Sequence, residues 1–355
     1  MGGIGVEAHG VNHCEIGDCR KIMQRWIDAG VRVQMCVCSP PYWGLRSYGI
    51  GSENGELGLE KTPQEYVERM VEVFRLVREL LVDDGTLWLN LGDSYAGSGK
   101  GPSNNSPLDR PYRGMSNIAA APNRWLSVPQ GIKPKDLCMI PARVALALQA
   151  DGWYLRSEIT WCKRVPMPES VQDRPTSATE KIFLLSKSAS YYYDADAVRN
   201  RPSEAFLNDS RWQTGSTDTN EKDGYEAAAA QNPKKLHRMF DKQRGHSRRN
   251  AGFNDRWDHM PKEQQMVNGS NMRNYWILGP EPYPEAHFAT FPREVPRRCI
   301  AAGSRPGDIV FDPFMGSGTT GQVAQNLGRR WLGCEINPDY ARLQDQRTAQ
   351  QAMIL

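Results

Sequence analysis

Two glycines one residue apart lie in a stretch that combines a strand pattern, a turn and a helix pattern. The apolar run 308–311 predicts a short buried strand, and residues 320–328 predict a helix. Glycine in the turn between them lets the backbone approach a ligand that a Cβ would block. A second predicted strand, 331–335, ends in Glu335, where nucleotide-binding α/β folds carry an acid that bonds ribose hydroxyls. The spacing predicts a cofactor site at Glu335 and at the glycine loop (312–320), whose residues are Asp312, Pro313, Phe314, Met315, Gly316, Ser317, Gly318, Thr319 and Thr320.

A second stretch whose residues could take part in a reaction is the proline turn (39–42), which consists of Ser39, Pro40, Pro41 and Tyr42. It follows the apolar run 34–38, which predicts a buried strand. Two successive prolines cannot continue a central strand, so they make a rigid turn at its carboxyl end. In open parallel sheets that edge is where ligands bind. Cys36 and Cys38, on the strand itself, are interpreted as small core residues.

The elements that must position these two turns alternate between strands and helices. Predicted strands cover 13–16, 34–38, 86–91, 154–161, 181–185, 308–311 and 331–335. Predicted helices cover about 19–26, 62–81, 141–150, 293–302 and 320–328. This alternation predicts an α/β fold with a Rossmann-like, mostly parallel sheet and helices on both of its faces.

The composition limits the class of protein. The chain has 355 residues, a net charge of +3 and eight cysteines, none of them in a CxxC pair. This predicts reduced thiols, no metal site and an intracellular, cytoplasmic location. The beginning of the chain does not have the pattern of a signal peptide, and no run of eighteen apolar residues predicts a membrane span.

Two stretches differ in composition from the predicted elements. Residues 97–135 are rich in Gly, Ser, Pro and Asn, and residues 199–276 are polar with interleaved aromatic side chains. Between 232 and 249 basic residues exceed acids; six of them are Lys234, Lys235, Arg238, Arg244, Arg248 and Arg249. One interpretation is a nucleic-acid contact region, and the other is a solvated, partly disordered insertion.

Together the two motifs resemble those of the amino-methylating DNA methyltransferases. That family has Ser, Asn or Asp followed by Pro-Pro-Tyr or Pro-Pro-Phe, and a cofactor loop of the form Asp-Pro-Phe-x-Gly-x-Gly. Residues 287–292 also match its His-x-x-x-Phe-Pro segment. The order, with the tetrapeptide first and the cofactor loop last, is similar to the permuted beta group. The resemblance covers about residues 13–95, 141–198 and 277–345.

The resemblance implies a methyltransferase sheet formed by 1–198 and 277–355, with 199–276 inserted as the target-recognition region. It implies double-stranded DNA as the partner, allows a homodimer and gives no role to a membrane. The six basic residues named above would contact DNA. The cofactor implied is S-adenosyl-L-methionine, and its binding residues would be Asp18, Thr290, Phe291, Pro292, Asp312, Pro313, Phe314, Gly316, Ser317, Gly318, Thr319 and Glu335. For Asp18 the competing interpretation is a helix cap.

The residue types of the proline turn also suit methyl transfer to an amine when they are considered without the family resemblance. An aromatic exocyclic amine is a poor nucleophile because its lone pair is delocalised into the ring. Acceptors that bond both amine hydrogens, such as the Ser39 hydroxyl and the Pro40 carbonyl, can direct the lone pair at a sulfonium methyl group. The prolines pre-organise this geometry, and Tyr42 offers a flat face to a flipped base.

Several alternatives stay open at this stage. Ser39 is more typical of cytosine-N4 enzymes, and adenine N6 is the second choice for the target. A protein or small-molecule N-methyltransferase is disfavoured by the motif order, and a non-catalytic DNA-binding module would not require both motifs. The region 97–135 competes with 199–276 for target recognition. Neither the recognition sequence nor a cognate restriction enzyme can be read from the chain.

Overall fold

The computed structural model describes residues 10–44, 51, 55–96, 131–200, 269–281 and 291–349. The chain divides into two compact units, of which one is Met1–Asp194 with Asn274–Leu355 and the other is Ala195–Arg273. In the smaller unit the described residues include the 3-10 turn η3 (Asp196–Val198) and a bridge between Asn200 and Ser270. Tyr275 and Trp276, which the sequence analysis placed in the insertion, belong instead to a strand of the larger unit.

The larger unit contains a sheet of eight described strands in the order β1-β8-β7-β2-β3-β5-β4-β6. Only β5 runs antiparallel to its neighbours, and every other pairing in this sheet is parallel. The predicted mostly parallel, Rossmann-like sheet is thereby confirmed. The strands are β1 (His13–Ile16), β2 (Val33–Cys38), β3 (Leu81–Leu91), β4 (Tyr154–Lys163), β5 (Thr179–Ser186), β6 (Tyr275–Leu278), β7 (Ile309–Asp312) and β8 (Arg330–Glu335).

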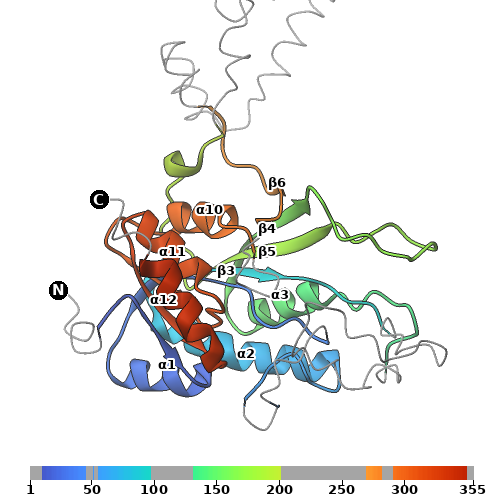
Figure 1. Cartoon of the computed structure of the whole chain (residues 1–355), viewed down its shortest axis with the longest axis horizontal. Helices are drawn as coiled ribbons and strands as arrows, with labels where there is room; N and C mark the ends of the chain where they lie inside the picture. The colour runs from blue at the N-terminus through green and yellow to red at the C-terminus, as the bar shows by residue number, and fades with distance from the viewer. Residues whose placement is uncertain are drawn as a thin grey trace, which may run out of the picture. The chain divides into compact units, whose positions relative to one another are not determined.

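Helices cover both faces of the sheet, as predicted (Figure 1). On one face α1, α2 and α3 contact each other in sequence, and on the other α10, α11 and α12 do so. Their bounds are α1 (Cys19–Asp28), α2 (Pro63–Leu80), α3 (Ile140–Ala150), α10 (Glu294–Gly303), α11 (Thr319–Asn326) and α12 (Ala341–Ala349), with the 3-10 turn η4 (Pro338–Tyr340) before α12. In the described part of the chain, no helix is long and apolar enough to cross a membrane.

Local chemistry explains where α2 begins. Thr62 caps α2 by accepting a hydrogen bond from the Glu65 amide at 3.1 Å, and Pro63 occupies the first turn. The start of β3 differs from the prediction. The strand begins at Leu81 rather than at Thr86, because Leu81 pairs with Val33 and Thr86 with Met35, so the residues between them form a bulge.

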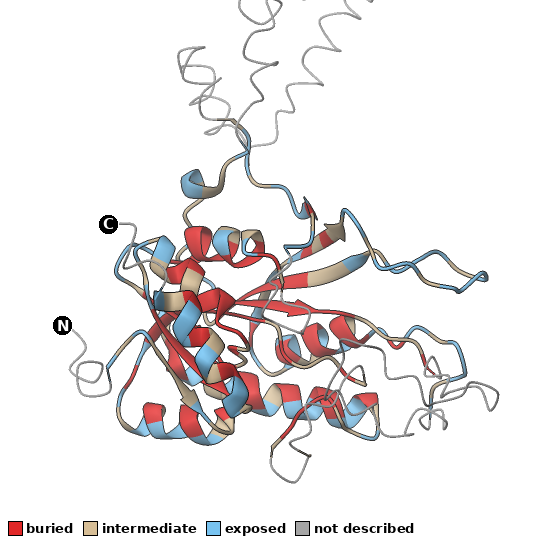
Figure 2. Cartoon of the chain, in the orientation of Figure 1, coloured by how far each residue is buried: buried red, intermediate tan, exposed pale blue. Residues whose placement is uncertain are grey.

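The central strands are buried on both faces (Figure 2). Cys36 lies in the core cluster shared with α1 and α2, whereas Met35 faces the other way. A Cβ on Gly303 of α10 would lie 2.9 Å from the Trp88 indole nitrogen and 3.2 Å from the Met35 sulfur, so this helix packs closely on the sheet. The site therefore rests on a rigid base.

Candidate active site

The proline turn and the glycine loop lie side by side. Strands β2 and β7 pair in parallel, with Met35 opposite Val310 and Cys36 opposite Phe311. Neighbouring strands are about 4.8 Å apart. The turns that follow Cys38 and Asp312 therefore occupy adjacent positions at the carboxyl edge of the sheet, which confirms the prediction that both motifs lie there on adjacent strands.

The glycine loop needs glycine for two different reasons. Gly316 has φ of 51° and Gly318 has φ of 89°, in the left-handed region that other residues rarely adopt. A Cβ on Gly318 would also lie 3.2 Å from the Cα of Gln344, so helix α12 packs on the loop. The nearest atom to a Cβ on Gly316 is 3.9 Å away, which leaves the backbone open to a ligand on that side.

Asp312 is a buried acid that organises the loop. One carboxylate oxygen accepts a hydrogen bond from the Phe314 amide at 2.9 Å, and the other accepts one from the Thr320 hydroxyl at 2.6 Å. Burial raises the pKa of the Asp312 carboxyl to about 7, against the effect of these two hydrogen bonds. These contacts show that Asp312 orients the loop.

Glu335 closes the loop from the end of β8. Its Oε2 accepts a hydrogen bond from the Gly316 amide at 2.7 Å, and its Oε1 accepts one from the Asn337 amide at 2.9 Å. Burial raises the pKa of the Glu335 carboxyl. Each oxygen of an ionised carboxylate has a second lone pair. Glu335 therefore keeps acceptor capacity beyond its backbone contacts, which suits a ribose hydroxyl.

Ser317 supports a polar ligand at the same place. Its hydroxyl is buried and has no hydrogen-bond partner among the described residues. Buried polar groups are nearly always satisfied, so an unpaired hydroxyl between two glycines marks a place for a ligand or water. The residues present in the glycine loop fit a nucleoside-type cofactor.

Helix α12 contributes two residues that the sequence analysis did not identify. The Gln344 amide donates to the Gly316 carbonyl at 2.7 Å, and the Arg347 guanidinium donates to the Thr319 hydroxyl. Both side chains are buried. The polar, weakly amphipathic segment 341–349 offers no periodicity from which a supporting helix could have been predicted.

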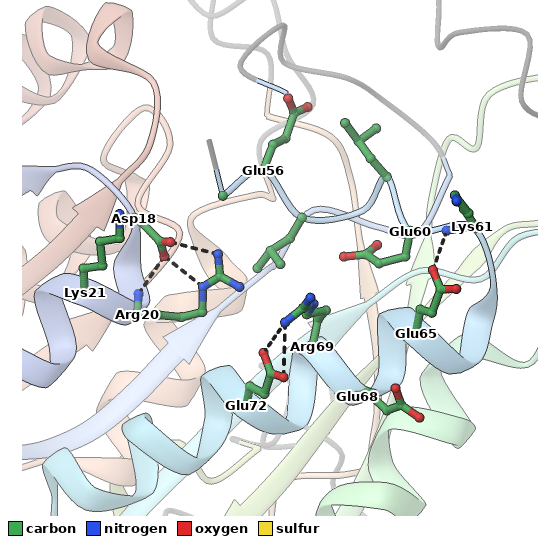
Figure 3. A pocket seen from close by; sticks show the side chains of 13 residues that line it. Asp18, Arg20, Lys21, Glu56, Glu60, Lys61, Glu65, Glu68, Arg69 and Glu72 are labelled. Atoms are coloured by element: carbon green, nitrogen blue, oxygen red, sulfur yellow. Dashed lines mark hydrogen bonds and ion pairs between the residues drawn. The ribbon is translucent and has the colours of Figure 1, made fainter. Parts of the chain in front are cut away.

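Asp18 caps helix α1, which was the alternative interpretation to cofactor binding. Its carboxylate accepts from the Arg20 amide at 3.0 Å, and Arg20 Nη2 lies 2.8 Å from its Oδ2. Burial works to raise the pKa of Asp18, but the hydrogen bonds and charge of Arg20 hold it below its ordinary value. Asp18 also borders a cavity of about 730 Å³ between α1 and α2 (Figure 3). Contact between Asp18 and a cofactor stays a prediction.

The cavity of Figure 3 is lined by six acids and four bases, some of which pair with each other. Arg69 Nη1 lies 2.9 Å from a Glu72 carboxylate oxygen, and the Lys61 amide donates to Glu65 at 3.0 Å. Among the residues described, no group of His, Cys, Asp and Glu is arranged to hold a metal ion.

The proline turn is held by side chains from distant parts of the chain. The Tyr42 hydroxyl lies 3.2 Å from the Ser39 hydroxyl, 2.6 Å from Glu180 Oε2 and 3.1 Å from Asn90 Oδ1. A Cβ on Gly92 would lie 2.5 Å from a carbon of the Tyr42 ring, so the ring lies directly against this glycine. The Tyr66 hydroxyl donates to the Pro41 carbonyl at 2.9 Å. These contacts fix the turn.

Glu180 is the residue that sequence reasoning missed in this half of the site. It is near the start of β5, and Leu91 at the end of β3 pairs with its neighbour Lys181. Because β5 is antiparallel, its beginning lies at the edge where the parallel strands end. Lys163, at the end of β4, places its ammonium 2.5 Å from Glu180 Oε1. The antiparallel direction of β5 was the missing information.

The remaining predicted residues fall into two groups. Cys36 and Cys38 are buried in the core as predicted, and burial raises the pKa of both thiols, which keeps them protonated. Phe291 is half-buried, and the Pro292 carbonyl accepts from the Val295 amide at 2.9 Å where α10 begins. Thr290 and the basic residues Lys234, Lys235, Arg238, Arg244, Arg248 and Arg249 lie outside the described residues.

Three comparisons with known proteins agree with each other. A family model described as DNA methylase matches residues 33–346. The Type II methyltransferase M.SmaI of Serratia marcescens is 40% identical over 334 residues, which cover 94% of this chain and 89% of that protein. The solved structure of PvuII DNA methyltransferase (cytosine-N4-specific) matches with a TM-score of 0.53 and 16% identity over 95% of this chain and 88% of its own. TTHA0409 from Thermus thermophilus, solved with S-adenosyl-L-methionine, matches with a TM-score of 0.51 and 20% identity over 97% of this chain and 95% of its own. The two structural matches share the fold.

Proposed function

The chain belongs to the DNA methylase family, and we propose that it transfers the methyl group of S-adenosyl-L-methionine to the N4 amine of cytosine in double-stranded DNA. The observation that carries the proposal is the pairing of β2 with β7. It brings a turn suited to hold an exocyclic amine next to a loop suited to hold a nucleoside. Transfer between two bound groups requires this kind of proximity.

The cofactor would lie along Gly316, Ser317 and Gly318, with its ribose at Glu335. S-adenosyl-L-methionine supplies an electrophilic methyl group on a sulfonium. The chain's own contribution is to place it: Glu335 offers a carboxylate at the end of β8, Ser317 offers a buried hydroxyl without a partner among the described residues, and the backbone at Gly316 is open on one side. Phe291 and Pro292 would border the methionine end, and Thr290 would join them.

The target base would have to leave the helix, because its amine cannot reach the proline turn inside a duplex. The Ser39 hydroxyl and Pro40 carbonyl would accept the two amine hydrogens and direct the nitrogen lone pair. Pro40 and Pro41 hold these acceptors in place, and the Tyr66 hydroxyl fastens the turn from α2. The exposed part of the Tyr42 ring would stack on the base.

Cytosine N4 is proposed because serine opens the tetrapeptide, and adenine N6 is the alternative. DNA contacts are assigned to the basic residues between 232 and 249 of the target-recognition region (199–276). The Lys side chains would bind phosphates, and the Arg side chains would bind phosphates and bases. As M.SmaI is a Type II methyltransferase, a cognate restriction enzyme is part of the same proposal, and a homodimer is compatible with it.

The test is mass spectrometry of nucleosides from DNA that the pure protein has methylated with S-adenosyl-L-methionine. N4-methylcytosine is the expected product, and N6-methyladenine would establish the alternative. A sample with neither nucleoside, from protein that binds the cofactor, would overturn the proposed function. Ser39→Ala protein, carried through the same procedure, controls for contaminating methylases.

A further inference from the structure

A line of hydrogen bonds leads from the proline turn to the mostly buried carboxylate of Glu180. The Ser39 hydroxyl lies 3.2 Å from the Tyr42 hydroxyl, which lies 2.6 Å from Glu180 Oε2. We propose that Glu180 receives, through Tyr42 and Ser39, the proton that the target amine loses during methyl transfer. This inference rests on the proposed function, which it deepens by assigning the route of the proton.

The direction of the hydrogen bonds follows from their lengths and charges. A tyrosine hydroxyl has one hydrogen to donate, and Glu180 Oε2 is its nearest and only charged acceptor among the described residues, whereas Asn90 Oδ1 is 3.1 Å away. Burial, followed by the charge of Glu180, raises the pKa of Tyr42 well above its ordinary value. The hydroxyl therefore stays neutral, donates to Glu180 and accepts from Ser39.

The carboxylate of Glu180 is held in place by an ion pair. Its other oxygen, Oε1, lies 2.5 Å from the ammonium of Lys163, and the Glu180 side chain is only 12% exposed. A buried carboxylate needs such a partner, because an unpaired charge is costly to remove from water. Lys163 therefore holds one oxygen of Glu180, which leaves the other directed at Tyr42.

Serine by itself has no charge with which to take up a proton. In the transfer the amine lone pair forms the nitrogen–methyl bond, while the carbon–sulfur bond breaks and its electron pair stays on sulfur. The nitrogen then carries a positive charge and loses one proton to the Ser39 oxygen. The Ser39 proton passes to the Tyr42 oxygen, and the Tyr42 proton passes to Glu180 Oε2.

This sequence is balanced in charge and atoms. It leaves a neutral methylated amine, a neutral sulfur, both hydroxyls restored and Glu180 protonated until it returns the proton to solvent. The amine nitrogen becomes strongly acidic once it is alkylated, so a carboxylate at the end of the hydrogen-bonded path can accept its proton. Glu180 does not contact the base. It acts through Tyr42 and Ser39 and receives the proton at the end of the path.

The experiment compares single-turnover methylation by the full-length wild type with that by Glu180→Gln, Tyr42→Phe and their double variant. Tyr42→Phe keeps the ring against Gly92 and removes only the hydroxyl. We expect each single variant to slow the methyl-transfer step on the order of 10²-fold, with the affinities for S-adenosyl-L-methionine and DNA unchanged. The double variant should be no slower than either single one, because both break the same path.

Two further variants separate a proton route from a packing role. Glu158→Gln is the matched control, because Glu158 pairs with Lys181 at 2.5 Å across the same two strands without contacting Tyr42. It should methylate at the wild-type rate. Glu180→Asp should restore part of the rate lost in Glu180→Gln, and the solvent deuterium isotope effect of the wild type should decrease in Tyr42→Phe.

A wild-type rate in Tyr42→Phe would overturn the relay, whether or not Glu180→Gln folds. Multiplied losses in the double variant would overturn it as well. Both outcomes leave the proposed function intact, since the wild type still methylates DNA. A wild type that forms no methylated nucleoside would overturn the proposed function, and with it the relay.

Discussion

The glycine loop and the proline turn are neighbours at one edge of the sheet, but they are held in different ways. The loop is organised mainly by partners within about one strand–helix–strand unit: Asp312 bonds Thr320 eight residues later, and Gly316 bonds Glu335 nineteen residues later. The turn depends on partners from three other elements. Tyr42 bonds Asn90 of β3 and Glu180 of β5, 48 and 138 residues away, and Pro41 accepts a hydrogen bond from Tyr66 of α2.

This difference has a functional meaning. A nucleoside site can be built from backbone amides and one acid at the end of a strand, which a single βαβ unit supplies. Transfer to an amine also needs a group that fixes the turn and receives a proton. In the proposed relay that group is Glu180, near the start of the antiparallel β5. Variants of the two regions should therefore fail in different ways.

The largest effect is expected for the proline turn. Ser39→Ala should lower the turnover number on the order of 10²-fold or more while the cofactor affinity stays near that of the wild type, because the hydroxyl acts on the amine. Steady-state methylation and calorimetry of S-adenosyl-L-methionine binding measure the two quantities. Cys38→Ala, one residue earlier, should retain activity because no covalent intermediate forms. Loss of cofactor binding in a folded Ser39→Ala protein would show that the assignment of this turn is wrong.

For the glycine loop we expect the opposite pattern. Gly316→Ala places a Cβ at φ of 51°, where the left-handed backbone costs roughly 1–2 kcal/mol. The Kd for S-adenosyl-L-methionine should rise about tenfold, since this backbone faces the ligand, while turnover at saturating cofactor is largely kept. Gly328→Ala is the control, with φ of 71° and no atom within 4 Å of the added Cβ. It should lose stability but not cofactor affinity; equal losses of affinity would contradict the placement.

A smaller effect concerns the acid under the loop. Asp312 has a pKa of about 7 in the fold, whereas an unfolded aspartate titrates near 4. The native protein thus keeps a proton that the unfolded chain releases. The stabilising contribution of this group is complete below about pH 4 and is lost as the pH rises through about 7. Asp312→Asn, which cannot ionise, should flatten the dependence of the free energy of unfolding on pH over this range.

Chemical denaturation at several pH values measures this dependence. The control is Asp345→Asn, which replaces an exposed acid on α12 and should leave the wild-type profile. An unchanged profile in Asp312→Asn would mean that the Asp312 carboxyl is ionised in the native protein. The loop would then carry a buried charge next to Glu335.

The smallest effect is expected away from both regions. Thr62→Ala removes the cap of α2 and should lower the free energy of unfolding by about 1 kcal/mol. Neither turnover nor cofactor affinity should change, because α2 holds the proline turn through Tyr66 rather than through its first residue. A thermal melt and the same two assays check this. A change in turnover would show that the site is sensitive to any loss of stability, and would weaken the comparison.

The sequence predicted the half of the site that is local. Gly316, Gly318 and Glu335 could be placed because strand, turn, helix and strand follow each other directly in the chain. The proline turn could be placed because two prolines end a buried run. Asp18 was ambiguous, since a residue before a helix can cap it or contact a ligand, and the structure shows the cap.

The features that the sequence could not predict depend on the direction of a strand in the sheet and on contacts between residues far apart in the chain. Glu180 became visible only once β5 was seen to run antiparallel to β3. Gln344 comes from a helix without a clear apolar face, and the early start of β3 is hidden by the acids and glycine of its bulge. In each case a partner elsewhere in the fold outweighs the local pattern.

The most direct test of this account is a structure of the protein bound to S-adenosyl-L-methionine and a DNA duplex that contains its target site. The account predicts ribose hydroxyls within about 3 Å of the Glu335 carboxylate and the sulfonium methyl directed at a base amine held by Ser39. A cofactor bound away from Gly316–Gly318, or a target amine that does not contact Ser39, would contradict it.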